Sequence, residues 1–391
     1  MERAAWSRIW RIQEKKKRIA LGLMSGTSGD GVDLALVEIS GRDLATDVKL
    51  LAFNSYLYPR SLRKRILELN SAKAEEICEM NFILGEVFAS CVLKFLQHHG
   101  YQAKQVDFLG SHGHTVYHIS QVPGKINSTL QIGEGAVIAA RTGILTIGDF
   151  RPGDIAAGGL GAPLVPFADF VLFREKGKVR AFINIGGIAN VTVVPEKLEE
   201  VLAFDTGPGN MVIDGLVSIY TKGKKKFDSQ GKIAAQGKVH KELLHQMRQH
   251  PYFRLEPPKS TGREIFGKSF LKEFVSAARQ ASFPDLIATA TYLTAISIFD
   301  AFKNYIFPKF RIDEVYISGG GLHNKTLLSF MKELFQPIPI KTLNALGIDG
   351  DAKEAVAFAL LADATLQGIS GNVPGATGAE RSAILGKVVF P

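Results

Sequence analysis

The sequence predicts an α/β protein built from two similar halves. The same order of elements, strand-strand-strand-helix-strand-helix-strand, is expected twice along the chain, and each half opens with a glycine-rich turn between its first two strands. At 391 residues the chain is also longer than one hydrophobic core usually serves, so two domains are expected. Ligands of such folds bind where loops leave the strand ends, which predicts a ligand cleft between the halves.

The first half begins with three strand-like runs joined by short links, a pattern typical of an antiparallel meander. Helical periodicity follows, most clearly over residues 72–100, where apolar residues recur every 3.6 positions on average. The expected strands are residues 18–23, 32–40, 47–58, 106–110, 128–132 and 144–148, and the expected helices are residues 59–70, 72–100 and 135–143.

The second half repeats this pattern without sequence similarity to the first. Its expected strands are residues 179–185, 191–195, 201–204, 313–318 and 338–343, and its expected helices are residues 211–220, 233–249, 284–305, 325–335 and 351–367. From these limits we expect a basic extension at 1–17, a first domain at 18–146 plus 370–391, and a second domain at 147–369.

Composition indicates an ordinary globular protein, with 46% hydrophobic and 22% charged residues. No apolar run approaches the roughly 20 residues that a membrane-spanning helix needs. The two cysteines, Cys78 and Cys91, form neither a metal-binding spacing nor a disulfide framework, which favours a reducing compartment. We therefore expect a cytoplasmic protein.

The first 18 residues hold much of the net charge of +9 and both tryptophans, Trp6 and Trp10. No apolar segment follows the charges, as a secretory signal would require. We expect this segment to lie outside the fold as a short basic helix. Contact with a membrane surface or nucleic acid is the less favoured alternative, and for the protein as a whole we expect neither partner.

A glycine-rich loop between the first two strands is the first candidate ligand site. Glycines allow a backbone to approach a ligand closely, and free N–H groups and hydroxyls, including that of Ser25, can surround phosphate oxygens. Its two aspartates suit Mg²⁺, directly or through water. The alternative is an ordinary glycine-rich hairpin turn. The candidate residues are Gly26, Thr27, Ser28, Gly29, Asp30, Gly31, Val32 and Asp33.

Two further glycine turns follow strands of the second half, at Gly186–Gly187 and at Gly319, Gly320 and Gly321. Each turn alone is a weak signal. Three such turns at equivalent places of a doubled fold predict a nucleotide site, because a nucleotide held between two domains needs contacts from both. The sequence contains neither a P-loop motif nor the dinucleotide-binding glycine motif that opens a helix.

Asp205 is the candidate general base, because it follows a predicted strand and precedes a tight glycine loop that opens a helix. A helix-capping or turn aspartate is an equally good interpretation of the residues alone. An aspartic protease would need a second Asp-Thr/Ser-Gly, which this chain lacks. Lys259 and Arg263, in a polar loop further along, either meet phosphate or are solvated.

Polar residues at strand exits of the first half suit a hydroxylated ligand. Arg151 can form two bonds with a carboxylate, or can instead pair internally with an aspartate. The histidines 112 and 114 invite a metal interpretation, but no further ligand completes a zinc set, so hydrogen bonding to hydroxyls or a structural cluster is preferred. The candidate residues are Ser111, His112, Thr115, Asp149, Arg151 and Glu354, the last facing either solvent or the cleft.

Taken together, these motifs resemble the anhydro-N-acetylmuramic acid kinase family from about residue 19 to residue 391. The resemblance is carried by Gly-Leu-Met-Ser-Gly-Thr-Ser (22–28), Ser-His-Gly (111–113), Asp-Phe-Arg (149–151), Gly-Ala-Pro-Leu-Val-Pro (161–166), Asn-Ile-Gly-Gly (184–187), Phe-Asp-Thr-Gly-Pro-Gly-Asn (204–210), Lys-Ser-Thr-Gly-Arg-Glu (259–264) and Gly-Gly-Gly (319–321).

The resemblance implies a duplicated actin-like ATPase fold of the ribonuclease H-like type. It implies an ATP- and Mg²⁺-dependent kinase that opens the 1,6-anhydro ring of its amino sugar with water and phosphorylates O6, in peptidoglycan recycling. Asp205 matches the base that activates the water, residues 26–33 match the ATP loop, and Arg151 matches the sugar pocket. A homodimer is also implied.

The chain departs from the family pattern at Gly29, where leucine is usual, at His114, where glutamine is usual, and around residues 347–350. Two competing functions stay open at this point. One is a nucleotide-dependent binding protein of the same fold, which would hydrolyse ATP slowly without sugar. The other is a kinase for a different amino sugar.

Overall fold

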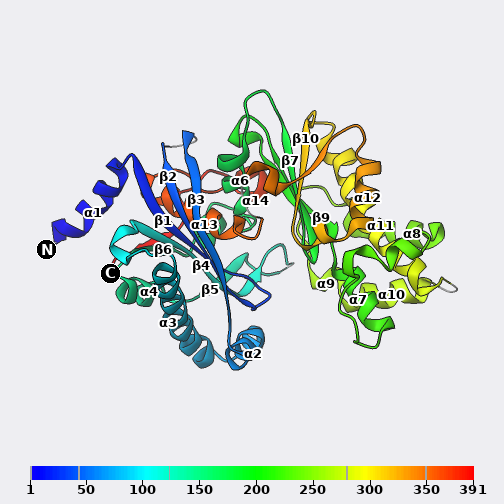
Figure 1. Cartoon of the computed structure of the whole chain (residues 1–391), viewed down its shortest axis with the longest axis horizontal. Coiled ribbons are helices and arrows are strands. Elements are labelled where there is room, and N and C mark those ends of the chain that lie inside the picture. Colours follow the sequence, from blue (N-terminus) through cyan, green and yellow to red (C-terminus); the bar gives the residue numbers. More distant parts are fainter. Residues whose placement is uncertain (1, 43–44, 123, 279–280, 348–349) are drawn as a thin grey trace. The chain divides into compact units, whose positions relative to one another are not determined.

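The computed structural model describes residues 2–42, 45–122, 124–278, 281–347 and 350–391 (Figure 1). It consists of two compact units: unit 1 is Met1–Leu172 with Asp351–Pro391, and unit 2 is Phe173–Gly350. The sequence predicted domain limits at 146/147 and 369/370, whereas the structure has them at 172/173 and 350/351. The difference arises because the segment after residue 146 and the helix after residue 351 pack on the sheet of unit 1.

Unit 1 is built on a mixed sheet with the strand order β12-β6-β4-β1-β2-β3, and β5 pairs with β4 off this path. β1, β2 and β3 form the expected antiparallel meander, while β4 runs parallel to β1 and β6 runs parallel to β4. The strands are β1 (Lys17–Ser25), β2 (Gly31–Ser40), β3 (Asp47–Leu57), β4 (Phe108–Ile119), β5 (Ser128–Ile132), β6 (Leu145–Gly148) and β12 (Lys387–Val389).

Unit 2 has a five-stranded sheet with the order β11-β10-β7-β8-β9. Its antiparallel meander β7-β8-β9, with β10 parallel to β7 and β11 parallel to β10, reproduces the order and directions of β6-β4-β1-β2-β3. The duplicated order expected from the sequence is therefore confirmed. The strands are β7 (Arg180–Ile185), β8 (Ile188–Val194), β9 (Leu202–Pro208), β10 (Glu314–Ser318) and β11 (Ile340–Thr342).

Helices cover both faces of the unit 1 sheet. Leu21 and Leu23 point into a core with α3, whereas the alternate residue Gly22 meets α13 on the other face. Gly22 and Gly110 let this helix approach β1 and β4 backbone to backbone, since a Cβ on Gly22 would lie 1.7 Å from the Ala355 carbonyl oxygen. The helices are α1 (Glu2–Glu14), α2 (Arg60–Glu68), α3 (Ala74–His98), α4 (Gly135–Thr142), α5 (Arg151–Ala156), α6 (Val165–Phe173), α13 (Lys353–Gln367) and α14 (Pro374–Thr377).

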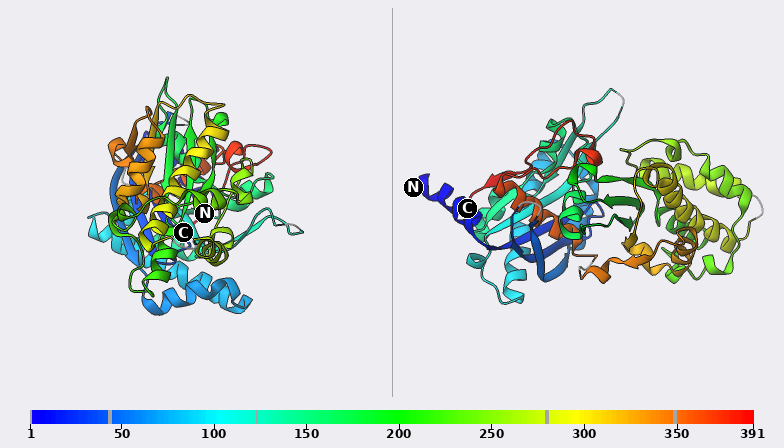
Figure 2. Two further views of the ribbon diagram at one scale, coloured as in Figure 1. Left: turned by 90° about the vertical axis from the view of Figure 1, so that its right-hand side faces the viewer. Right: turned by 90° about the horizontal axis from the view of Figure 1, so that it is seen from above.

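The core of unit 2 forms where α11 and α12 pack on the sheet and where α7, α8 and α10 pack on α11 (Figure 2). Residues 283–306 have the length and hydropathy of a membrane span, but 78% of the tested window is buried within the protein, as expected of a core helix. The helices are α7 (Met211–Tyr220), α8 (Lys241–Arg248), α9 (Arg263–Phe266), α10 (Lys268–Ala277), α11 (Phe283–Ala301) and α12 (Lys325–Leu334).

Three expectations about elements are wrong. The expected helix 233–249 is a short 3-10 turn followed by the shorter helix α8, because Gly237 and an extended segment interrupt it. Strand β4 continues through residues 111–115 to Ile119, since it gains β5 as a partner. Helix α10 was not anticipated.

The basic extension is also attached to unit 1 rather than separate from it. Ile9 and Ile12 of α1 are buried, while Trp6 and Trp10 are exposed. Arg8 donates to the Gly143 carbonyl (3.1 Å), and the Trp6 ring meets the ring of Phe390 edge-on at 6.0 Å. Both ends of the chain therefore lie on the same side of unit 1 (Figure 1, Figure 2).

We predict that Gly22→Ala destabilises the protein by about 3 kcal/mol or more, because the new methyl group collides with main-chain atoms of α13 that cannot rotate away. Urea unfolding measures this loss. Gly135→Ala is the control, since its Cβ would meet its nearest neighbour at 3.4 Å, an ordinary contact. Equal stability of Gly22→Ala and the wild type would contradict the close helix-sheet contact.

Candidate active site

The loop between β1 and β2 forms a tight turn in which the Gly29 N–H donates to the Gly26 carbonyl (3.0 Å) and Gly29 has a φ of +61°. The side chains of Thr27 and Ser28 are exposed on this turn. Ser25 differs from expectation. Its hydroxyl is buried and hydrogen-bonded to Tyr58 Oη (2.7 Å) and His114 Nδ1 (3.0 Å). Ser25 therefore stabilises the base of the loop from the protein interior and does not face a phosphate.

The remaining residues of the loop have distinct environments. Val32 is completely buried in the core, so only its main chain can meet a ligand. Asp30 forms an ion pair with Arg63 on α2. Asp33 accepts a hydrogen bond from Ser55 Oγ (2.5 Å), and burial raises the pKa of its carboxyl. Asp33 is therefore the better-suited of the two carboxylates for a hydrated Mg²⁺, since Asp30 is already neutralised by a cation.

His112 and Arg151 form a buried pair in unit 1. Arg151 donates from Nε (3.1 Å) and Nη2 (2.9 Å) to His112 Nε2, and from Nη1 to the Gly161 carbonyl (2.8 Å). His112 Nδ1 faces the Gly113 carbonyl at 3.0 Å, so the network assigns a neutral ring with its proton on Nδ1. Burial and the neighbouring guanidinium hold the pKa of His112 well below its usual value.

This pairing argues against a metal at the two histidines, since His112 Nε2 and His114 Nδ1 are both engaged in hydrogen bonds. Over the described ranges, no three His, Cys, Asp or Glu side chains are grouped to hold a metal ion. It also argues against an internal Asp–Arg ion pair at this position. Asp154 instead binds the Gly161 N–H (2.8 Å) and Thr377 Oγ1 (2.7 Å), which makes it a structural residue.

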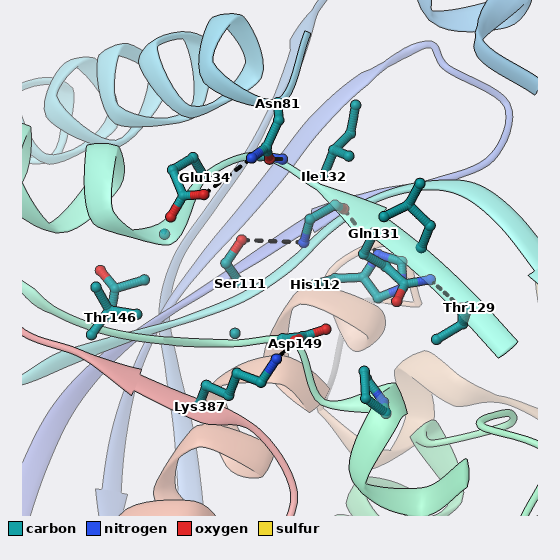
Figure 3. Close-up of a pocket in the computed structure, with 17 residues that line it drawn as sticks. Asn81, Ser111, His112, Thr129, Gln131, Ile132, Glu134, Thr146, Asp149 and Lys387 are labelled. Carbon is teal, nitrogen blue, oxygen red and sulfur yellow. Dashed lines mark hydrogen bonds and ion pairs between the residues drawn. The ribbon is translucent and has the colours of Figure 1, made fainter. Parts of the chain in front are cut away.

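A pocket of about 500 Å³ opens within unit 1 beside this pair (Figure 3). Asp149, which has a φ of +59°, lines it and pairs with Lys387 on β12. Ser111 lies across the pocket, with its Oγ accepting from the Gly113 N–H (3.2 Å). His112 and Gly113 line the same space, so three of the predicted substrate residues, Ser111, His112 and Asp149, border one cavity.

The sequence analysis missed most of the residues that line this pocket, among them Gln131 and Lys387. Gln131 on β5 donates from Nε2 to Thr115 Oγ1 (3.2 Å) and Thr129 Oγ1 (2.6 Å), while its Oε1 is buried with no hydrogen-bond partner among the described residues. Thr115 thus contacts Gln131 but is not itself a lining residue. Lys387 lies too far along the chain from Asp149 for any sequence spacing to reveal the pair.

Glu354 begins α13 in the same unit, beside the buried pair of Lys353 Nζ and Asp169 Oδ1 (2.9 Å). Its side chain reaches solvent, yet partial desolvation raises the pKa of its carboxyl, and the charges of Asp33 and Asp169 add to this. The cations Lys353 and Arg151 oppose that shift. Glu354, Asp33 and Arg151 therefore share one electrostatic neighbourhood.

In unit 2, the two predicted glycine turns lie side by side at the ends of the paired strands β7 and β10. Asn184 is the register partner of Ser318, and a Cβ on Gly321 would collide with the Ile185 side chain. The Gly186 and Gly187 carbonyls accept N–H groups from residues 209–211 at 2.8–3.0 Å, so those N–H groups at the start of α7 are not free. A Cβ on Gly320 would have its nearest neighbour at 3.6 Å, so there is free space beside this residue.

Asp205 lies inside β9 rather than after it, and its main chain is clamped on two sides. Its N–H donates to the Lys259 carbonyl (3.1 Å), and its carbonyl accepts from Tyr252 Oη (2.7 Å). Its Oδ2 accepts the Thr261 N–H (2.9 Å). Burial raises the pKa of Asp205 to about 6, the Thr261 hydrogen bond and Lys259 lower it, and Glu264 raises it.

These contacts favour a base over a helix cap, because the Asp205 carboxylate binds the Thr261 N–H rather than the first turn of α7. Thr261 Oγ1 is buried beside it, with no hydrogen-bond partner in the part of the chain that the structure describes. Lys259 is not solvated. It is buried within unit 2, whereas Arg263 is exposed.

Comparison with known proteins identifies the relatives of the chain. The family model described as anhydro-N-acetylmuramic acid kinase matches residues 18–391. A protein of that name from Caldanaerobacter subterraneus subsp. tengcongensis is 47% identical over 97% of this chain and 99% of its own length. Another from Bacillus cereus (strain G9842) is 44% identical over 95% and 98%.

Among solved structures, the activator of the 2-hydroxyisocaproyl-CoA dehydratase from Clostridium difficile aligns with 90% of this chain and 96% of its own, at 13% identity and a TM-score of 0.44. The family assignment therefore depends on the sequence relatives.

At Gly29, the left-handed backbone predicts that two substitutions lower the stability by different amounts. Gly29→Ala should cost about 1 kcal/mol through backbone strain. Gly29→Leu should recover part of that loss, because its side chain can pack on Ile66 and Leu67, whose atoms lie 3.2–3.3 Å from a Cβ at this position. Urea unfolding and nucleotide affinity are the measurements.

Gly26→Ala is the control in the same loop, since its φ is not positive and its Cβ would have its nearest neighbour at 3.8 Å. If Gly29→Leu were less stable than Gly29→Ala, the expected packing on α2 would be wrong.

Proposed function

The chain belongs to the anhydro-N-acetylmuramic acid kinase family, and we propose that it converts 1,6-anhydro-N-acetylmuramic acid, ATP and water into N-acetylmuramic acid 6-phosphate and ADP. In this reaction water adds to C1, the C1–O6 bridge breaks, and O6 takes the γ-phosphoryl group. We place this reaction in peptidoglycan recycling in the cytoplasm, carried out by a homodimer.

The observation that carries the proposal is the environment of Asp205. A pKa of about 6 leaves its carboxylate ionised at neutral pH, yet basic enough to accept a proton from water. The clamped main chain holds the carboxylate in one place, as general-base catalysis requires. The unpartnered Thr261 hydroxyl beside it supports a second contact to the attacking water.

The unit 1 pocket supports recognition of an anionic amino sugar. Arg151, beside this pocket, is a half-buried cation that donates to the neutral acceptors His112 Nε2 and the Gly161 carbonyl, which leaves its charge available to the carboxylate of a muramic acid. Ser111, Asp149 and Gln131 add donors and acceptors for hydroxyl and acetamido groups. About 500 Å³ is ample for one monosaccharide.

The glycine turns support ATP as the phosphoryl donor. Thr27, Ser28 and Gly320 are exposed in these turns at strand ends, where main-chain groups and the hydroxyls of Thr27 and Ser28 can meet a phosphate. Mg²⁺ would neutralise phosphate charge during transfer. Asp33 fits an outer-sphere role toward such an ion, because a half-buried carboxylate can accept from metal-bound water.

The reaction is tested by ADP release with and without the anhydro sugar, together with the mass of the product. We expect sugar-dependent ADP release and a product heavier than the substrate by one phosphoryl group and one water. ADP release that does not depend on the sugar would favour a nucleotide-dependent binding protein. Release with a different amino sugar alone would correct the substrate.

We predict that Asp205→Asn lowers sugar-dependent turnover by about 10²–10⁴-fold, because the amide cannot accept the proton from water. The folded state should be at least as stable at pH 7, since the buried carboxylate with its raised pKa loses stability as pH rises through about 6. Asp214→Asn is the matched control, a second half-buried aspartate of unit 2 with a pKa of about 6. Near-native turnover of Asp205→Asn would refute the base.

The single-turnover rate should fall about tenfold per pH unit below pH 6, since only the ionised Asp205 can act as base. The rate is measured at saturating ATP and sugar, so that product release does not mask the chemical step. Asp214→Asn should show the same fall of the rate at low pH, the acid limb of the pH–rate profile. Loss of the limb in that variant would assign it to Asp214.

A further inference from the structure

Lys259 is a buried ammonium surrounded by aromatic rings. Its side chain is 6% exposed, and Nζ lies 4.9 Å from the ring centre of Tyr252, 5.0 Å from that of Tyr305 and 5.9 Å from that of Phe204. Its Nζ donates to the Tyr252 carbonyl at 3.5 Å. Cation–π attraction from three rings holds the ammonium in this cage.

The main chain around this cage is the same main chain that holds Asp205. The Lys259 carbonyl accepts the Asp205 N–H, and the cage residue Tyr252 donates its hydroxyl to the Asp205 carbonyl. Two residues beyond Lys259, the Thr261 N–H binds the Asp205 carboxylate. The Lys259 side chain is thus the anchor of a segment that contacts Asp205 through both its main chain and its carboxylate.

We propose that Lys259 is a positioning residue for Asp205, fixing the 259–261 segment through its aromatic cage and adding a nearby positive charge that favours the ionised carboxylate. This inference rests on the role of Asp205 in the proposed function. It does not place Lys259 in contact with substrate.

The charges around Asp205 have opposing effects on the ionisation of its carboxyl group. Lys259 favours the ionised carboxylate, whereas Glu264 on α9 opposes it, and the neutral hydroxyl of Tyr252 binds the Asp205 carbonyl. Burial lowers the pKa of Lys259 to about 8, and Asp205 partly offsets this. The ammonium is therefore present where Asp205 titrates and is lost only above about pH 8, where Asp205 is ionised without its help.

Lys259→Met tests the inference, because methionine keeps the length and packs on aromatic rings but carries no charge. In single-turnover rates across pH 5–9, we expect the acid limb to move up by about 0.5–1 pH unit. The variant should be about two- to threefold slower than wild type at pH 6.5 and indistinguishable from it at pH 8.5. A purely structural role would lower the rate equally at every pH, and that result would overturn the proposal.

Lys341→Met is the matched control, since Lys341 also lies over a ring, at 5.9 Å from Tyr316, but is paired with Glu314. The acid limb of its pH–rate profile should lie at the same pH as in the wild type. If Lys259→Met fails to fold, Glu264→Gln tests the same charge balance from an exposed position and should move the limb down. An unmoved limb in the folded variants overturns the proposal.

The assignment of Asp205 as the base and the role of Lys259 are tested by different outcomes. If Asp205→Asn keeps its activity, the assignment of the base is wrong, whatever Lys259 does. If Asp205→Asn is inactive and the limb of Lys259→Met does not move, the base stands and only the role of Lys259 is wrong.

Discussion

The main-chain contact between α13 and the unit 1 sheet is the constraint on which the rest of that unit depends. Gly22 on β1 and Gly110 on β4 have no side chain at the point where the helix backbone touches the strands. The strands continue directly into the glycine loop and into Ser111–Thr115, and the helix begins at Lys353 and Glu354. The same contact therefore brings the glycine loop, strand β4 and Glu354 into one region.

Burial sets the charge states of the candidate site more than direct ion pairing does. His112 stays neutral because it is enclosed and faces a guanidinium, and Asp205 gains basicity because it is enclosed with few donors. Arg151 is bonded to a neutral ring and a carbonyl. The pKa values of His112 and Asp205 are thereby moved away from those of exposed side chains, as is common at functional sites.

The sequence predicted the duplicated order of elements and most strands because alternating apolar residues and glycine turns are local signals. It also predicted the residues around the pocket in unit 1, since Ser111, His112 and Asp149 follow buried strands that pair in parallel. The helix expected at residues 233–249 is longer than α8, because the apolar periodicity continues across Gly237, where the backbone becomes extended.

The failures involve contacts between distant segments. Ser25 has the composition of a phosphate ligand, and only the approach of Tyr58 and His114 buries it. Lys259 looks like a solvated loop lysine until three rings from separate elements enclose it. The domain limits were misplaced for the same reason, since the pairing of β6 with β4 and β12 assigns the segment after residue 146 to unit 1.

The pairing of β12 with β6 has a consequence for synthesis on the ribosome. Unit 2 is one uninterrupted segment, so all of its sheet partners exist once residue 350 has left the exit tunnel. Unit 1 lacks α13, β12 and Lys387 at that moment, although most of it was translated first. Domains fold as units when their chain is complete. Unit 2 can therefore fold before unit 1 is complete, and the pocket of unit 1 forms only once β12 is available to pair with β6.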